Sequence, residues 1–368
     1  GKQASIRFGA LSMGNLRDQH VQLGTFLSVI QALEIAGRED IAISGLVCDS
    51  RKVQSGMLFF ALPGVKFDGY EYLPQVLDAG AVAVVAEQIP DVCAAGVCYI
   101  KVANARQAMA VMAAEFYGQP TADVPVIGVT GTNGKTTTTY LLEAIFKQAG
   151  YSPAVFGTIE CRFGEMSYEA SITTPESLDL MRMMAEFRQQ GADVLILEVS
   201  SHALEQHRVD GIHFDAAIFT NLTQDHLDYH ETFARYFASK RRLFVDLLGD
   251  GVAIINREDS WGVELLKENP NWLSFGLDDQ ADVYPLEVTV SRDQIYGTFA
   301  SQHGDVVIES GMIGDFNVSN LLGVVATAQQ LGISNEDISK GIMLAPQVPG
   351  RVEKVQNNQG VLALVDYA

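Results

Sequence analysis

A buried strand followed by a glycine-rich turn and a helix constrains the fold of this chain most. Residues Val124 to Thr130 are apolar at almost every position, which is typical of a strand buried on both faces. A helical pattern follows and ends at Gly150; its apolar positions are Leu141, Leu142, Ile145, Phe146 and Ala149. Three further segments predict buried strands, with helical patterns between them: 193–199, 216–221 and 251–256. Such an order predicts an α/β fold with a parallel sheet, which binds ligands at the carboxyl ends of its strands.

The flanking segments predict how the rest of the chain is organised. Short apolar runs and a helical pattern at 71–79 predict a small N-terminal α/β domain, and Asn104 is placed to cap a helix that runs to Tyr117. Alternating apolar residues at 283–314 predict antiparallel strands added to the parallel sheet, followed by helices at 317–331 and 335–344. The polar, turn-rich segment at 118–123 suits a linker. We expect domains at 1–122 and 123–350, with 351–368 as the first strand of another.

Charge and composition exclude several classes of partner. The chain has 25 basic and 45 acidic side chains, a formal net charge of −20, which disfavours nucleic acid and anionic membranes as partners of the whole chain. A small phosphate ligand needs only one local site. No apolar run approaches the roughly 18 residues that span a bilayer. The four cysteines form no CxxC pair, and free thiols favour a cytoplasmic location. We expect a monomer, although the sequence does not determine the oligomeric state.

The turn after the first buried strand has the composition of a phosphate loop. Its residues are Gly131, Thr132, Asn133, Gly134, Lys135, Thr136 and Thr137. Backbone N–H groups and the helix N-terminus would surround the phosphates, Lys135 would neutralise their oxygens, and the Thr136 hydroxyl would bind Mg²⁺. The usual phosphate-loop pattern has glycine where this chain has Val129, so the loop is of a divergent kind. The alternative is a glycine-rich turn with an exposed lysine.

Polar residues also follow the next two strands of the predicted sheet. Glu198 ends one strand, where a carboxylate could complete a metal site, and His226 lies in a polar loop after the next strand. The helix after that loop carries Lys240, Arg241 and Arg242, which could equally form a solvated basic face. Because the carboxyl ends of parallel strands meet at one edge, we expect Lys135, Glu198 and His226 to lie close together.

These segments together resemble the Mur ligase superfamily and, within it, the branch of UDP-N-acetylmuramoyl-tripeptide synthetases. The segments are GTNGKTT from Gly131, TTPES from Thr173, EVSSHALEQHRV from Glu198, FTNLTQDHLDYH from Phe219, and GDFNVSN from Gly314. Lys240 follows His226 by fourteen residues. The resemblance extends from about Ser44 to Ala368, and EVSSHAL with QHRV is specific to this branch.

The resemblance implies an ATP-dependent amide ligase of cytoplasmic peptidoglycan precursor synthesis. ATP would phosphorylate the D-Glu γ-carboxylate of UDP-MurNAc-L-Ala-D-Glu, and a diamino acid, meso-diaminopimelate or L-lysine, would attack the acyl phosphate. Thr136 and Glu198 would hold one Mg²⁺, while Glu198, His226 and a carbamylated Lys240 would serve a second. Lys135, Glu198, His226 and Lys240 would form the catalytic set. Carbamylation turns a cation into an oxygen donor, which suits Mg²⁺.

The resemblance also assigns substrate contacts. The residues implied against the muramoyl-dipeptide are Thr173, Thr174, Ser200, Gln206 and Arg208; those implied against the UDP group are Cys48, Ser50, Val65, Lys66 and Phe67. Some relatives have His-Gln where this chain has Val65-Lys66, and Lys66 could instead contact the pyrophosphate. Asn317 is expected at the base or ribose of ATP and Arg351 at the phosphates. Asn317 could also be a helix N-cap.

The sequence departs from the family pattern at its C-terminus. Family members continue into a Rossmann-like domain that carries the Asp-Asn-Pro-Arg motif and selects the amino acid, whereas this sequence stops at Ala368. We therefore expect the 368-residue chain to bind nucleotide and UDP-sugar without completing ligation. The alternatives are a folylpolyglutamate-type or MurF-type ligase, a nucleotide-binding regulatory relative without turnover, and a phosphate-loop kinase. EVSSHAL and QHRV disfavour the other ligases, and retention of the metal set disfavours the regulatory relative.

Overall fold

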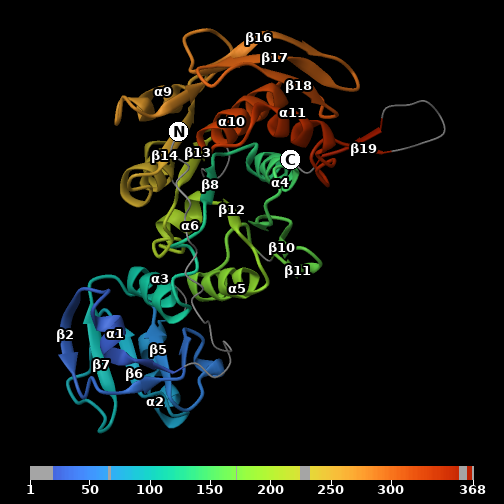
Figure 1. The fold of residues 1–368 in the computed structure, drawn as a ribbon. Coiled ribbons are helices and arrows are strands. Elements are labelled where there is room, and N and C mark those ends of the chain that lie inside the picture. The colour runs from blue at the N-terminus through green and yellow to red at the C-terminus, as the bar shows by residue number, and fades with distance from the viewer. Residues whose placement is uncertain (1–19, 65–67, 171, 224–232, 356–362, 367–368) are drawn as a thin grey trace, which may run out of the picture. The chain divides into compact units, whose positions relative to one another are not determined.

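The computed structural model describes residues 20–64, 68–170, 172–223, 233–355 and 363–366, and the chain divides into two compact units, 1–120 and 121–368 (Figure 1). The first unit is built on a five-stranded sheet in the order β2-β7-β6-β5-β4, in which only β2 is antiparallel to its neighbour. Its elements are β1 (Val21–Gln22), α1 (Leu23–Leu27), β2 (Ala32–Ala36), β3 (Ala42–Ile43), β4 (Gly45–Val47), η1 (Ser50–Lys52), β5 (Met57–Ala61), η2 (Gly69–Tyr72), α2 (Leu73–Asp78), β6 (Ala83–Ala86), β7 (Cys98–Val102) and α3 (Ala105–Phe116).

Two helix predictions for this unit can be compared with the structure. The Asn104 side chain caps α3 by accepting a hydrogen bond from the Gln107 N–H at 2.9 Å, as expected. The helix predicted at 71–79 is shorter, since α2 begins at Leu73 and a 3-10 turn, η2, precedes it. Asp68 caps that turn by accepting from the Tyr70 N–H.

The second unit is built on an eleven-stranded sheet in the order β11-β10-β9-β12-β8-β13-β14-β15-β16-β17-β18. Neighbouring strands are parallel throughout the central part of this order, β9-β12-β8-β13-β14-β15-β16. Antiparallel strands extend the sheet at both edges. The strands are β8 (Val126–Thr130), β9 (Pro153–Phe156), β10 (Glu160–Phe163), β11 (Met166–Glu169), β12 (Val194–Glu198), β13 (Ala216–Phe219), β14 (Val252–Asn256), β15 (Leu273–Phe275), β16 (Val283–Val290), β17 (Ile295–Ser301), β18 (Val306–Ser310), β19 (Glu353–Val355) and β20 (Ala363–Val365).

Helices cover both faces of this sheet. Ile127 and Val129 of β8 share one apolar core with α4, α10 and α11. On the other face, Phe156 contacts the ring of Phe187 in α5, and Phe219 contacts the ring of Phe244 in η3. The helices are α4 (Lys135–Gln148), α5 (Ser177–Gln189), α6 (Ser201–Glu205), α8 (Phe233–Arg242), the π-helical η3 (Leu243–Leu247), α9 (Ser260–Leu266), α10 (Phe316–Gln330) and α11 (Asn335–Leu344).

The predicted parallel sheet with added antiparallel strands is therefore confirmed, together with its two helical layers. Strands β9, β10, β11 and β15 were not predicted. The β19–β20 pair forms a separate two-stranded antiparallel sheet, and its assignment to a further domain stays a prediction.

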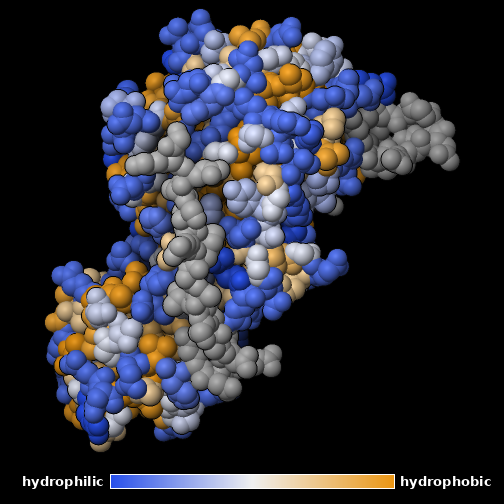
Figure 2. All heavy atoms as spheres, viewed as in Figure 1, coloured by the Kyte–Doolittle hydropathy of each residue, from blue (hydrophilic) through white to orange (hydrophobic). Residues whose placement is uncertain are grey.

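The surface is consistent with the acidic composition. On the face shown in Figure 2, hydrophilic residues predominate over the second unit and apolar residues lie in small groups. None of the helices in the described part of the chain is long and apolar enough to cross a membrane.

Candidate functional site

Two glycines shape the loop between β8 and α4. Gly134 precedes α4 with a φ of +87°, and Gly131 has a φ of +149°; both values are rare for residues with a side chain. A Cβ on Gly131 would lie 1.8 Å from Thr220 Oγ1, and one on Gly134 would lie 2.4 Å from Asn320 Oδ1. The loop can therefore pack this closely against its neighbours only with glycine at both positions.

The loop is held by the segment that follows β13. Thr132 N donates to Asn221 O at 2.9 Å, and Asn133 N donates to Asn221 Oδ1 at 2.9 Å. The Thr220 hydroxyl donates to Asn133 O at 2.6 Å, and Thr223 N donates to the Thr132 hydroxyl at 3.0 Å. The side chain of Thr132 thus contributes to loop structure. Sequence reasoning identified the polar segment that begins at Thr220 but predicted no role for Thr220 and Asn221 in holding the loop.

Two lysines converge on the loop carbonyls. Lys135 Nζ donates to Gly131 O at 2.8 Å and to Thr132 O at 2.9 Å, while Lys240 Nζ donates to Gly131 O at 3.0 Å. Lys240 is 1% exposed and its ammonium lies 4.5 Å from the centre of the Tyr236 ring. Burial and, secondarily, the charge of Lys135 place the pKa of Lys240 well below its ordinary value. The interpretation of Lys240 as part of a solvated basic face is wrong.

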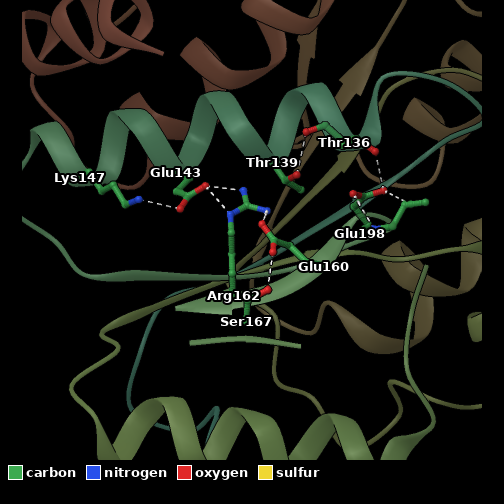
Figure 3. A network of polar contacts seen from close by, with 9 residues as sticks. Thr136, Thr139, Glu143, Lys147, Glu160, Arg162, Ser167 and Glu198 are labelled. Atoms are coloured by element: carbon green, nitrogen blue, oxygen red, sulfur yellow. Dashed lines mark hydrogen bonds and ion pairs between the residues drawn. The ribbon is translucent and has the colours of Figure 1, made fainter. Parts of the chain in front are cut away.

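Glu198, at the end of β12, lies next to the start of α4 (Figure 3). It is 2% exposed, and its Oε2 accepts a hydrogen bond from the Thr136 hydroxyl at 3.1 Å. Thr158 donates to both carboxylate oxygens, from its N–H to Oε1 at 3.1 Å and from its hydroxyl to Oε2 at 2.8 Å. All three donors are uncharged. A buried carboxylate beside a hydroxyl is an oxygen donor set that suits Mg²⁺.

A second group of predicted residues is hydrogen-bonded to the main-chain carbonyl of Glu198. The Thr174 hydroxyl donates to Glu198 O at 2.9 Å, and Ser200 N donates to Thr174 Oγ1 at 3.1 Å. Arg208 Nη1 donates to Thr174 O at 3.1 Å, and its Nη2 forms an ion pair with Glu176 at 2.9 Å. The Arg208 Nε is buried without a hydrogen-bond partner among the described residues.

Two other residues of the predicted acceptor set lie beside this group. The Thr173 hydroxyl is 3.2 Å from the Thr158 hydroxyl. Gln206 follows α6, whose N-terminus Ser200 caps by accepting from the Ala203 N–H. Hydrogen bonds through Thr158, Thr174 and Glu198 therefore join Thr136 to Thr173, Ser200 and Arg208.

The predicted nucleotide residues Asn317 and Arg351 line one pocket together with Thr137 of α4. The pocket is further lined by Gly311, Met312, Ile313, Ala345, Pro346, Gln347, Val348 and Val352. The interpretation of Asn317 as an N-cap is wrong, because α10 begins at Phe316 and the capping position is Asp315. Instead, Asn317 Nδ2 donates to Ile313 O at 2.8 Å, and its Oδ1 accepts from Asn320 Nδ2 at 2.9 Å.

Some predicted residues belong to the first unit or lie outside the described residues. Cys48 follows β4 and Ser50 begins η1, so both lie at the carboxyl end of a parallel strand. Val65, Lys66, Phe67 and His226 lie outside the described residues. Within the described ranges, no group of three or more His, Cys, Asp or Glu side chains is placed to hold a metal. Among the described residues, Thr136 and Glu198 are the predicted metal residues that offer oxygen donors.

Comparison with known families and relatives gives a consistent result. Residues 129–328 match the family described as "Mur ligase middle domain", and residues 42–117 match the family described as "Mur ligase family, catalytic domain". A UDP-N-acetylmuramoyl-L-alanyl-D-glutamate–2,6-diaminopimelate ligase from Geobacter metallireducens is 47% identical over 355 residues, which cover 95% of this chain and 69% of the relative. The ligase of the same name from Gloeobacter violaceus is 40% identical over 337 residues, with 91% and 69% covered.

Solved structures show the same relationship at the level of the fold. A structure of a UDP-N-acetylmuramoyl-L-alanyl-D-glutamate–2,6-diaminopimelate ligase superposes with a TM-score of 0.81 at 29% identity, covering 93% of this chain and 70% of that one. A MurF structure from Acinetobacter baumannii gives a TM-score of 0.65 at 23% identity, with 93% and 72% covered.

Proposed function

The chain belongs to the Mur ligase family of ATP-dependent amide ligases of peptidoglycan synthesis, and from that premise we propose that its acceptor is UDP-MurNAc-L-Ala-D-Glu and its amino acid is 2,6-diaminopimelate. The observation that carries the proposal is the similarity to ligases of that name, which extends over 95% of the chain at 47% identity. The same similarity favours diaminopimelate over L-lysine.

The reaction joins two substrates through a phosphorylated intermediate. A γ-carboxylate oxygen of the D-glutamate attacks the γ-phosphorus of ATP and ADP leaves. The amine then attacks the acyl carbon, phosphate leaves, and the amide forms with loss of a proton. Both reactants of the first step are anions, so the protein must position them in line and screen their charge.

The second unit has groups for these tasks. The backbone N–H groups of 134–136 at the start of α4 would bind the ATP phosphates. Lys135 would turn from the loop carbonyls toward the phosphate oxygens. Thr136 and Glu198 would hold Mg²⁺, which when bound screens the phosphate charge. Asn317 and Arg351 would contact the nucleoside and phosphates from the pocket that they share with Thr137.

Carbamylation of Lys240 is part of the proposal. Only a neutral amine attacks CO₂, and burial lowers the pKa of Lys240 so that the neutral form is more abundant. The nitrogen bonds to the carbon of CO₂ and loses a proton, and the remaining N–H can still donate to Gly131 O. The carbamate oxygens, with Glu198 and His226, would then bind a second Mg²⁺. A ¹³C-bicarbonate NMR signal that is lost in Lys240→Met tests this.

Acceptor contacts are proposed for each unit separately. In the second unit, the contacts are proposed for Thr173, Thr174, Ser200, Gln206 and Arg208; in the first unit, for Cys48, Ser50, Val65, Lys66 and Phe67. Arg208 suits a carboxylate or phosphate because its planar guanidinium offers two parallel donors and its Nε has no described partner.

Binding and turnover measurements test the function. Calorimetry should show that the protein binds Mg²⁺·ADP and UDP-MurNAc-L-Ala-D-Glu. Turnover assays should show phosphate release only when UDP-MurNAc-L-Ala-D-Glu, ATP and an amino acid are all present, and faster release with meso-diaminopimelate than with L-lysine. Phosphate release without an amino acid would contradict the proposal and favour a kinase. Nucleotide binding without any turnover would favour a regulatory relative.

A further inference from the structure

Thr158, in the turn between β9 and β10, contacts Glu198 in a way that fixes the orientation of its carboxylate. The N–H of Thr158 donates to Oε1 at 3.1 Å and its hydroxyl donates to Oε2 at 2.8 Å. A single hydrogen bond leaves a carboxylate free to rotate about its terminal torsion, whereas donors on both oxygens define its plane. The turn can approach this closely because residue 157 is glycine, where a Cβ would lie 2.4 Å from Glu198 Oε1.

The fold holds this turn from both sides. On one side, β9 pairs in parallel with β12, and Phe156 and Leu197 are register partners directly before Gly157 and Glu198. On the other side, β10 carries Arg162, whose guanidinium forms an ion pair with Glu143 of α4 at 2.5 Å (Figure 3). The same guanidinium lies 4.1 Å from the centre of the Tyr140 ring. Thr158 therefore has a position set by the sheet and by α4.

The hydroxyl of Thr158 also connects Glu198 to Thr173. The Thr158 and Thr173 hydroxyl oxygens are 3.2 Å apart. The Thr158 hydroxyl is the donor in both contacts, to Glu198 Oε2 at 2.8 Å and to Thr173 Oγ1 at 3.2 Å. A hydroxyl has one proton, so the shorter contact to the carboxylate is the stronger of the two. Removal of this hydroxyl would therefore take a hydrogen bond from Glu198 and a neighbouring donor from Thr173.

We propose that Thr158 is a positioning residue that orients Glu198 for a divalent cation and holds the Thr173 hydroxyl beside that carboxylate. This inference rests on the proposed function. Thr158 is itself exposed, so its side chain is not needed to fill the core. Partners that orient a metal ligand typically change metal affinity by about 10- to 100-fold when they are removed.

Two substitutions of the same residue test the inference. Thr158→Val keeps the shape and removes the hydroxyl, whereas Thr158→Ser keeps the hydroxyl. Mn²⁺ binding in the presence of ADP, followed by electron paramagnetic resonance, should weaken about 10-fold in Thr158→Val and less than 2-fold in Thr158→Ser. Calorimetric affinity for UDP-MurNAc-L-Ala-D-Glu should fall about 3-fold or more in Thr158→Val, because Thr173 loses the hydrogen-bond donor that holds its hydroxyl.

A matched control separates positioning from folding. Thr327→Val removes a buried hydroxyl that donates to Gly323 O within α10, about 15 Å along the helix from Asn317. It should leave both affinities unchanged, and the thermal midpoint of Thr158→Val should match that of the unsubstituted protein. Unchanged or tighter Mn²⁺ binding in Thr158→Val, with normal binding in the unsubstituted protein, would overturn the inference. Absence of Mn²⁺·ADP binding in the unsubstituted protein would instead overturn the proposed function.

Discussion

Replacing Gly131 by alanine tests whether the close packing of the loop against the segment after β13 is essential. The new Cβ would lie 1.8 Å from Thr220 Oγ1 and 3.1 Å from Asn221 N and O. The Thr220 side chain must therefore rotate away and give up its hydrogen bond to Asn133 O. The φ of +149° would also be strained in a residue with a side chain.

The magnitude can be worked from these contacts. A residue held in a sparsely populated backbone region costs about 1–3 kcal/mol. The lost hydrogen bond adds about 1 kcal/mol. Gly131→Ala should therefore lower the free energy of unfolding of the second unit by about 2–4 kcal/mol, and weaken ADP binding, because the displaced loop carries the phosphate-binding N–H groups.

Urea unfolding and ADP calorimetry measure both effects, with Gly332→Ala as the control. Gly332 has a φ of +82°, but a Cβ there meets nothing within 4 Å, so only backbone strain of about 1 kcal/mol is expected. Gly131→Ala combined with Thr220→Ala should recover part of the loss, since the nearest clashing atom is removed. If Gly131→Ala costs no more than Gly332→Ala, the reasoning about close packing is refuted.

Two further substitutions have defined outcomes. The pKa of Lys240 is lowered in the folded state, so the unfolded chain binds more protons at this residue. The free energy of unfolding therefore increases as the pH rises toward the unfolded pKa, and it decreases as the pH falls. In bicarbonate-free buffer, the free energy of unfolding of the unsubstituted protein should rise between pH 7 and 9 relative to that of Lys240→Met, by up to about 1.4 kcal/mol per pH unit. If the two proteins show the same dependence of unfolding free energy on pH, the prediction is contradicted. Glu143→Gln removes the nearer carboxylate of Arg162, whose side chain is 14% exposed, and leaves Glu160 at 3.8 Å. It should cost about 3 kcal/mol in urea unfolding. The control Glu336→Gln removes an exposed ion pair with Lys340 and should leave the free energy of unfolding unchanged. Equal losses of stability in Glu143→Gln and Glu336→Gln would refute the distinction between a buried and an exposed ion pair.

The features that could be predicted from the sequence are local along the chain. The periodicity at 124–150 correctly located β8, the loop and α4, because an apolar strand and an amphipathic helix leave their pattern in consecutive residues. The alternation at 283–310 located β16, β17 and β18 for the same reason. Asn104 was identified as a cap because a cap and its N–H partner are three residues apart.

Other features depend on pairs of residues that are distant in sequence. The Asn317 side chain was open to two interpretations, and the start of α10 at Phe316 excluded the capping one. The burial of Lys240 could not be read from a basic triplet, since exposure depends on what packs over the helix. Strands β9 to β11 are short and were missed because their pairing partners, rather than their own composition, stabilise them.

The sequence by itself determined the strand, loop and helix that would bind phosphate, and the family to which the chain belongs, since both depend on residue identity and spacing. Only the tertiary structure placed Thr158 against Glu198, 40 residues away, and Thr220 against Gly131. The physical reason is that hydrogen-bond geometry and burial depend on distances between side chains, and those distances are set by the register of neighbouring strands. Sequence spacing does not contain that register.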